Sequence, residues 1–285
     1  MKKIFKFFAV AAMAAVAFAC SKDETDGGVS YKYDSDAIFV VVENPEVVGL
    51  ESVELLRTGD YRIVPTRGKF YKAGVAKALT PAVYEGSFTK SGNTYNLDGM
   101  GTMTIQKAGG VATINLQRPD AEAITFSGNI SEAISGAKKF DGKYAVKTTQ
   151  ISVSGTSLPE KLAARFTGLD VNEIAAWLIK KDVDLEDMEI PENQKVTEVR
   201  ISQFGTIAIK FANGANYEGK WDWENVTAGL IDYDWFECPE IEILEGDFSI
   251  KSSGSNVVLT VETEAKDSDG AVYNVVVKIT LKAVK

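Results

Sequence analysis

The sequence predicts a mainly β protein made of two antiparallel domains, each a barrel or a sandwich. After Tyr31 the chain consists largely of short runs rich in Val, Ile, Thr, Tyr and Phe, separated by Gly, Asn-Gly or Asp-Gly, which is typical of strands joined by tight turns. Several segments recur in the same order in the two halves, and one helical pattern interrupts the second half. A length of 285 residues suits one or two domains.

The expected strands follow one another at short intervals. In the first half they are 37–42, 52–56, 61–64, 83–88, 102–106, 111–116 and 123–127. In the second half they are 143–153, 195–202, 206–211, 216–223, 241–244, 247–252, 256–263 and 272–282. Turn pairs such as Asn213-Gly214 and Asp269-Gly270 predict hairpins between neighbours. Many antiparallel strands with short turns indicate a barrel or a sandwich.

An internal repeat divides these strands into two sets. Segment 52–64 (SVELLRTGDYRIV) is similar to 198–210 (EVRISQFGTIAIK), segment 84–88 to 217–221, and segment 101–109 to 246–254. The offsets of 146, 133 and 145 residues come in the same order along the chain, which indicates duplication of one β unit of roughly 110 residues. We therefore expect domains at 31–138 and 139–285, with Gly59 equivalent to Gly205, Gly86 to Gly219 and Gly101 to Gly246.

The helical pattern lies within the second domain, at 157–181. Pro159 follows Ser157 closely, and the run 160–166 ends before Gly168, as in a short capped helix. Asp170 and Glu173 form a capping box, followed by an apolar stripe of Val171, Ile174, Ala175 and Leu178. We expect a helical pair that covers one end of the second domain, with Trp177 as a core anchor.

Two short motifs, Gly142-Lys143-Tyr144 and Gly219-Lys220-Trp221, resemble the Gly-x-Trp strand with which lipocalin-type (calycin-like) barrels often begin. The resemblance covers about half of the chain. It implies two lipocalin-like barrels, as in uncharacterised surface lipoproteins of Bacteroidota. An immunoglobulin-like sandwich is the alternative architecture.

Composition and charge exclude several classes of function. With 45% hydrophobic and 25% charged residues, the chain is neither disordered nor a polytopic membrane protein. It has 31 basic and 40 acidic residues, and loss of Lys2, Lys3 and Lys6 with a signal peptide leaves 28 against 40, a net charge of −12. This charge opposes a nucleic-acid partner. Because the sequence holds no histidine, Ser-His, Cys-His and His-rich zinc sites are excluded.

The N-terminus has the pattern of an export signal. Residues 1–19 run from lysines into an apolar stretch too short to span a bilayer, as in a signal peptide. The stretch ends in Ala17-Phe18-Ala19-Cys20, which resembles the lipobox of bacterial lipoproteins, although Ala17 replaces the usual Leu and Phe18 is bulky. The resemblance implies acylation of Cys20, whereas cleavage by ordinary signal peptidase is the alternative.

The next four residues, 21–24 (SKDE), resemble the Lys-acid-acid signal that Bacteroidota lipoproteins carry when they are displayed on the outer face of the outer membrane. A solvated linker is the plainer interpretation. The resemblance implies a surface-exposed protein anchored in the outer membrane, with residues 20–30 as a lipidated tether. If Cys20 is acylated, Cys238 is left without a disulfide partner, and we interpret it as a buried apolar residue.

An aromatic and acidic cluster at 221–237 contains the candidate ligand-binding residues Trp221, Trp223, Tyr233 and Trp235. Aromatic rings beside carboxylates bind sugars in many proteins. The alternation in 217–224, however, places Trp221 and Trp223 on one strand face, which is also the pattern of a half-buried strand. Core packing is the preferred interpretation, and ligand contact is the alternative.

Other constellations are weaker. Paired carboxylates could serve a glycosidase, but 40 acidic residues make chance pairs unavoidable. The run 267–270 (DSDG) lacks the remaining ligands of a calcium loop and fits a hairpin turn. Met100 and Met103 could ligate haem, but their spacing places them on opposite faces of a strand.

The sequence therefore predicts a non-enzymatic, lipid-anchored cell-surface binding protein of unknown ligand, with no catalytic residues, metal or cofactor. A glycan-binding accessory lipoprotein is the first alternative. A purely structural surface protein and a haem-binding lipoprotein follow. Expected partners are the membrane, through Cys20, and a glycan or small apolar ligand, but no nucleic acid.

Overall fold

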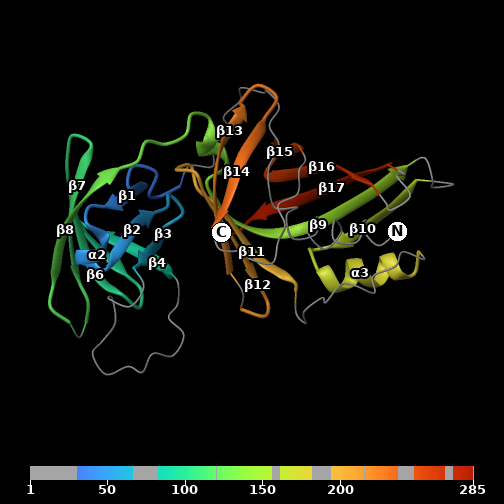
Figure 1. The fold of residues 1–285 in the computed structure, drawn as a ribbon. Coiled ribbons are helices and arrows are strands. Elements are labelled where there is room, and N and C mark those ends of the chain that lie inside the picture. The colour runs from blue at the N-terminus through green and yellow to red at the C-terminus, as the bar shows by residue number, and fades with distance from the viewer. Residues whose placement is uncertain are drawn as a thin grey trace. The chain divides into compact units, whose positions relative to one another are not determined.

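The computed structural model describes residues 31–66, 83–119, 121–155, 161–181, 194–214, 216–236, 247–266 and 272–284. These residues fall into two compact units, one ending at Ala133 and the other beginning at Ile134. Each unit is a closed antiparallel barrel of eight strands, and the described residues include two α-helices (Figure 1). The mainly β class and the two barrels predicted from the sequence are confirmed, and the sandwich alternative is wrong.

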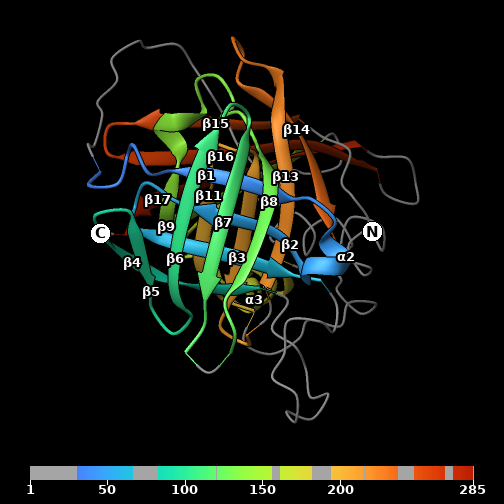
Figure 2. The same cartoon turned by 90° about the vertical axis from the view of Figure 1, so that its left-hand side faces the viewer.

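The first barrel joins its eight strands in sequence order, and β1 closes it by pairing with β8. Figure 2 faces this barrel, with β6, β7 and β8 side by side. A four-residue helix, α2 (Pro45–Val48), connects the first two strands. The strands are β1 (Ile38–Val42), β2 (Leu50–Leu55), β3 (Asp60–Pro65), β4 (Tyr84–Ser91), β5 (Thr94–Leu97), β6 (Gly101–Ala108), β7 (Val111–Gln117) and β8 (Ile124–Ile130).

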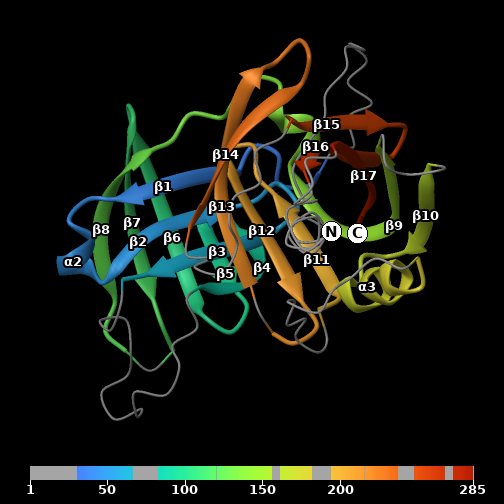
Figure 3. The ribbon, with the colours of Figure 1, turned by 45° about the vertical axis from the view of Figure 1, so that its right-hand side comes forward.

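The second barrel closes where its first strand, β9, pairs with its last, β17. A further strand, β10, pairs with β9, and helix α3 (Val171–Ile179) follows it (Figure 3). A 3₁₀ turn, η1 (Ala137–Phe140), precedes β9. The strands are β9 (Gly142–Gly155), β10 (Leu162–Thr167), β11 (Val196–Ile201), β12 (Thr206–Phe211), β13 (Asn216–Asn225), β14 (Leu230–Phe236), β15 (Asp247–Ser253), β16 (Asn256–Lys266) and β17 (Val272–Ala283).

Each barrel has an apolar core of its own, built by the alternation of its strands. In β17 the residues Val275, Val277 and Ile279 are buried, whereas Asn274 and Lys278 on the opposite face are exposed, as expected for a strand with one face in a core. The buried apolar residues form two separate clusters, one within each unit. This separation excludes a single core shared by interleaved strands.

The hairpin between β2 and β3 has the same hydrogen bonds as the hairpin between β11 and β12. Gly59 adopts a φ of 92° and Gly205 a φ of 82°, a backbone region that favours glycine. The amide of Gly59 donates to the carbonyl of Leu56 over 3.0 Å, and the Gly59 carbonyl accepts from the Phe88 amide over 2.7 Å. The amide of Gly205 donates to Ser202 over 3.2 Å, and its carbonyl accepts from Trp221 over 2.9 Å.

The remaining strand pairs keep the same register in both barrels. The correspondence holds at each of these pairings, including the one that closes the barrel. The equivalent residue pairs, first barrel and then second, are Ile38↔Leu55 and Gly142↔Ile201, Tyr61↔Gly86 and Ile207↔Gly219, Lys90↔Tyr95 and Trp223↔Ile231, Thr94↔Thr104 and Leu230↔Ser249, Met103↔Leu116 and Phe248↔Val261, Leu116↔Ile124 and Val261↔Val277, and Val41↔Asn129 and Ala145↔Lys282. The pairs from the repeated segments occur at the offsets found in the sequence. Gly246 lies outside the described residues, so its equivalence with Gly101 is not tested directly.

The first half of the expected helical stretch 157–181 is wrong, because residues 162–167 form strand β10. Their exposure alternates with a period of two, with Ala163 and Arg165 exposed and Phe166 buried. Alanine, leucine, lysine and arginine favour helix in isolation. Here the long strand β9 offers an open edge, and pairing with it satisfies the backbone of β10.

The second half of that stretch forms α3 as expected. The Asp170 carboxylate accepts hydrogen bonds from the amides of Asn172 at 3.0 Å and Glu173 at 3.4 Å, which caps the helix. Val171 and Ile174 belong to the core of the second barrel. Trp177 is half-buried, and its ring packs edge-on against Phe166 at 6.0 Å.

Besides β10, two strands were not among those expected. β5 has only four residues and follows a turn at Gly92, so it offers little pattern to detect. β14 coincides with the acidic and aromatic cluster, whose alternation is in fact that of a strand. The expected strand 241–244 lies outside the described residues.

Candidate functional site

The predicted ligand-binding residues lie on neighbouring strands of the second barrel, β13 and β14. Trp221 pairs with Tyr233, and its side chain is 3% exposed within the core. A ring buried to this extent cannot stack on a ligand arriving from solvent. The side chains of Tyr233 and Trp235 lie outside the described part of the structure, as do Cys20 and Cys238.

Trp223 is half-buried and has a structural role. Its indole Nε1 donates to the Ser135 carbonyl at 2.9 Å, and its ring packs edge-on against Phe140 at 6.1 Å and against Trp221 at 5.3 Å. These contacts hold the ring against Ser135 and η1. They support the core interpretation of the aromatic pair.

The equivalent corner of the first barrel is polar. By register, Lys90 corresponds to Trp223 and Tyr95 to Ile231. Asp36 and Phe140 each lie two residues before the equivalent strand positions Ile38 and Gly142. Asp36 is buried and accepts hydrogen bonds from the Lys90 ammonium and, at 2.9 Å, from the Tyr95 hydroxyl. At this corner the first barrel therefore has a charged network, whereas the second barrel has aromatic packing.

This network shifts two pKa values upward. The hydrogen bond to Asp36 raises the pKa of Lys90, because the carboxylate favours the charged ammonium. Burial, and then the hydrogen bond to Asp36, raises the pKa of Tyr95. Both groups therefore keep their protons at neutral pH, and the corner serves to hold the segment before β1 against the hairpin β4–β5.

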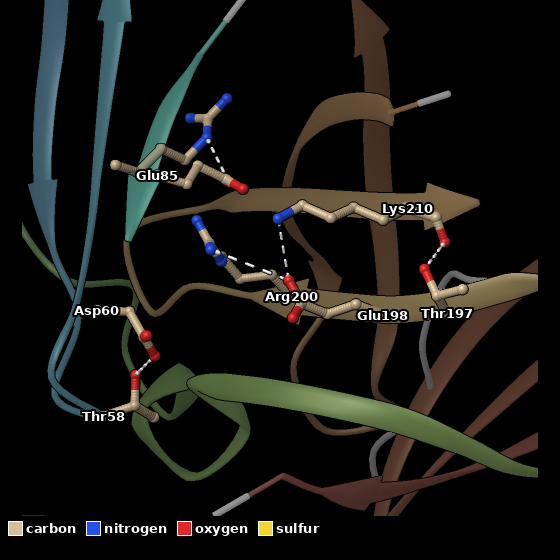
Figure 4. A network of polar contacts seen from close by, with 8 residues as sticks. Thr58, Asp60, Glu85, Thr197, Glu198, Arg200 and Lys210 are labelled. Atoms are coloured by element: carbon tan, nitrogen blue, oxygen red, sulfur yellow. Dashed lines mark hydrogen bonds and ion pairs between the residues drawn. The ribbon is translucent and has the colours of Figure 1, made fainter. Parts of the chain in front are cut away.

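Charged side chains on β3, β4, β11 and β12 form ion pairs within their own barrel (Figure 4). In the first barrel, Arg62 Nε lies 3.7 Å from Glu85 Oε1. In the second, Glu198 Oε1 lies 3.3 Å from Lys210 Nζ and 4.0 Å from an Arg200 nitrogen. Charges compensated in this way are not available to a ligand without breaking a pair.

A hollow of about 590 Å³ lies on the outward face of the second barrel, across β10, β9, β17 and β16. Three cations line it, two from the β10 segment (Lys161 and Arg165) and one from β17 (Lys278), with Glu262 on β16 as the acidic member. We call this feature the basic hollow.

The cations of the basic hollow are not compensated within the described part of the chain. Lys161, Arg165 and Lys278 are exposed, and none forms an ion pair or hydrogen bond with another side chain there. The whole chain carries a net charge of −9. A positive hollow on an acidic protein concentrates the local potential and attracts anions.

The basic hollow depends on the insertion that distinguishes the second barrel. In the first barrel, α2 alone connects β1 to β2, whereas β10 and α3 lie between β9 and β11. Register places Thr125 of β8 at the position of Lys278, and Asn115 donates a hydrogen bond to Thr125 at 2.8 Å. The first barrel therefore has neutral residues at this position.

Sequence reasoning missed these cations because it assigned 160–166 to a helix. The alternation of buried and exposed residues in 272–282 does place Lys278 outward. Only the pairing of β10 and β17 with opposite edges of β9 brings the three cations together.

Met100 and Met103 are both buried in the core of the first barrel. Their expected position on opposite faces of one strand is wrong, because Met100 lies in the turn before β6. Within the described ranges no three His, Cys, Asp or Glu side chains are grouped to hold a metal ion. None of the helices described is long and apolar enough to cross a membrane.

No family model and no curated protein matches the chain. Two of the solved structures that match the chain are only weakly similar to it. A protein of unknown function from the DUF3598 family of Nostoc punctiforme is 7% identical, with a TM-score of 0.23, over 87% of this chain and 94% of that one. A mutant of the vaccine antigen transferrin binding protein B from Haemophilus parasuis is 9% identical, with a TM-score of 0.25, over 85% of this chain and 56% of that one. Likeness at this level does not extend to function.

Proposed function

We propose that the protein is a non-enzymatic binding protein, anchored on the outer face of the outer membrane by a lipid on Cys20, with the basic hollow as its ligand site. The observation that carries the binding role is the set of exposed cations in that hollow, which are unpaired within the described part of the chain. Such a concave arrangement on an acidic protein favours an anionic ligand.

The composition supports a role in binding rather than catalysis. The chain has no histidine, which removes the commonest general base. Two buried charged groups of the first barrel have partners: Asp36 pairs with Lys90 and Tyr95, and Arg57 pairs with Asp34 at 2.8 Å. These pairs stabilise the barrel and leave no free acid-base couple at that corner.

The anchor rests on the sequence of residues 1–30. A lipobox-like stretch ends at Cys20, and the following Ser21-Lys22-Asp23-Glu24 is similar to a surface-export signal. Three acyl chains on a bacterial lipoprotein would hold the chain far more firmly than the marginal anchoring of one chain.

Glycan binding through the aromatic cluster is the second candidate, but Trp221 and Trp223 do not favour it. Trp221 is buried, and Trp223 is held by a hydrogen bond to Ser135 and by ring packing against Phe140. A glycan ligand would more readily use the basic hollow, where exposed side chains are available.

Metabolic labelling tests the anchor. Cells expressing the protein receive an alkyne analogue of palmitate, and the wild type is compared with Cys20→Ser. We expect label on the wild type alone, and accessibility of the wild type to an externally added protease. Equal labelling of the two proteins would refute the anchor.

A further inference from the structure

We infer that the basic hollow binds a small polyanion, with two acidic groups of the ligand held by Arg165 and Lys278. The ligand is defined by carboxylate or phosphate groups separated by neutral polar atoms. This inference rests on the proposed binding function and makes it more specific.

The spacing of the cations follows from strand register. Arg165 of β10 and Lys278 of β17 both lie directly across from Gln150 of β9. Their backbones are therefore two strand spacings apart, roughly 10 Å, and both side chains project from the outward face. A single small anion would be held firmly by only one of them, whereas a ligand with two acidic groups would engage both.

Lys161 extends the positive region along β10. It lies four residues before Arg165, which is roughly 13 Å along an extended chain. The three cations are therefore spread over a triangular area and not clustered at one position. Arg165 has the geometry for a bidentate contact with a carboxylate or phosphate, whereas the two lysines act as point charges.

The rest of the lining indicates what lies between the acidic groups. The amide of Gln150 stands between Arg165 and Lys278, and Ser152 supplies a hydroxyl next along β9. These neutral groups donate to and accept from hydroxyl or ether oxygens. Glu262 on β16 limits the positive region on that side, because it would repel a further acidic group.

The charges of the basic hollow have no counterpart among the described residues of the first barrel. The position of Lys278 is occupied by Thr125, and that barrel has no strand equivalent to β10. Binding should therefore be confined to the second barrel, which makes cations elsewhere suitable controls. Lys107 on β6 and Lys251 on β15 are exposed and lie outside the hollow.

Isothermal titration of the full-length protein with three probes tests the inference. Trigalacturonate supplies carboxylates on a hydroxylated backbone, tetrapolyphosphate supplies phosphates, and maltotriose is the neutral sugar control. We expect at least one of the two anions to bind, more weakly at high salt, and maltotriose not to bind. Which anion binds identifies the acidic group.

The double variant Arg165→Gln/Lys278→Gln should weaken anion binding at least 100-fold, about tenfold for each lost contact. The control Lys107→Gln/Lys251→Gln removes the same charge and should leave affinity within twofold. Failure of both anions to bind, equal binding of maltotriose, or an equal loss in the two double variants would overturn the inference. Palmitate labelling of the same proteins tests acylation of Cys20 separately. A failed titration with normal labelling would therefore refute polyanion binding without refuting the lipid anchor.

Discussion

The two barrels share one pattern of strand pairing but differ in what is added to it. Both have eight antiparallel strands in the same register, and the hairpin glycines Gly59 and Gly205 make the same hydrogen bonds. The second barrel alone has β10 and α3, and the basic hollow lies against β10. The comparison distinguishes residues that maintain the fold of both barrels from residues that form the basic hollow of the second barrel.

Truncation of an equivalent core pair should produce the largest effects. Phe88 and Trp221 occupy the same position in the two barrels, and each is 3% exposed. Phe88→Ala and Trp221→Ala should each lower the free energy of unfolding of the affected barrel by about 3–5 kcal/mol. Denaturant unfolding followed by amide exchange would assign each loss. Equal loss in both barrels from one substitution would contradict independent cores.

The hairpin glycines should respond unequally to alanine. At Gly205 a Cβ would meet the backbone carbonyl of Trp221 at 2.8 Å, whereas at Gly59 it would meet the ring of Tyr33 at 2.9 Å. A ring can move more easily than a strand backbone. Gly205→Ala should cost about 2 kcal/mol and Gly59→Ala about 1 kcal/mol, measured by thermal unfolding. Gly254 has a positive φ and open space around it, so Gly254→Ala measures the backbone contribution alone. A larger loss of stability from Gly59→Ala than from Gly205→Ala would refute the steric argument.

Loss of the α3 cap should destabilise the second barrel alone. Asp170→Ala removes the acceptor for the Asn172 and Glu173 amides and should cost about 1 kcal/mol. Lys180→Ala, on an exposed residue beyond the helix, is the matched control. Chemical denaturation of both variants measures the difference, and an Asp170→Ala protein as stable as the control would show that α3 contributes little to the barrel.

Alkaline pH should destabilise the corner formed by Asp36, Lys90 and Tyr95 but not the equivalent corner of the second barrel. This is the smallest of the expected effects on stability. The folded state raises the pKa of Lys90 above 10.5 and the pKa of Tyr95 above 10.0. The folded barrel therefore holds these protons more tightly than the unfolded chain. The stability they contribute is complete below about pH 10 and declines as pH rises through the folded pKa values.

The second barrel has Trp223 and Ile231 at the equivalent positions, so this corner contributes no such decline. Melting temperatures between pH 8 and 11 would measure it in the wild type and in Tyr95→Phe. A smaller alkaline decline is expected in the variant. An unchanged decline would place the pH-sensitive groups elsewhere.

The fold could be predicted because the information that specifies it is local. Alternation in β17 predicts which side of the strand is buried, and the glycines at the β2–β3 and β11–β12 turns lie where a positive φ is needed. The same alternation favoured a core position for Trp221, and the structure places it there.

The candidate site could not be predicted because it depends on long-range pairing. Lys161 to Phe166 contains good helix formers, and only the free edge of β9 converts this segment into a strand. Arg165 and Lys278 are more than 100 residues apart in the sequence. Their proximity follows from pairing with opposite edges of β9, which no local pattern reveals.

Amide hydrogen exchange of the full-length protein, with and without trigalacturonate or tetrapolyphosphate, tests most directly whether the inserted strand gives the second barrel its ligand site. We predict that the bound anion slows exchange in β10, in residues 148–155 of β9 and in the facing part of β17. The equivalent strands of the first barrel, β1 and β8, should exchange at unchanged rates. Slowed exchange in the first barrel, or no change in β10, would contradict the account.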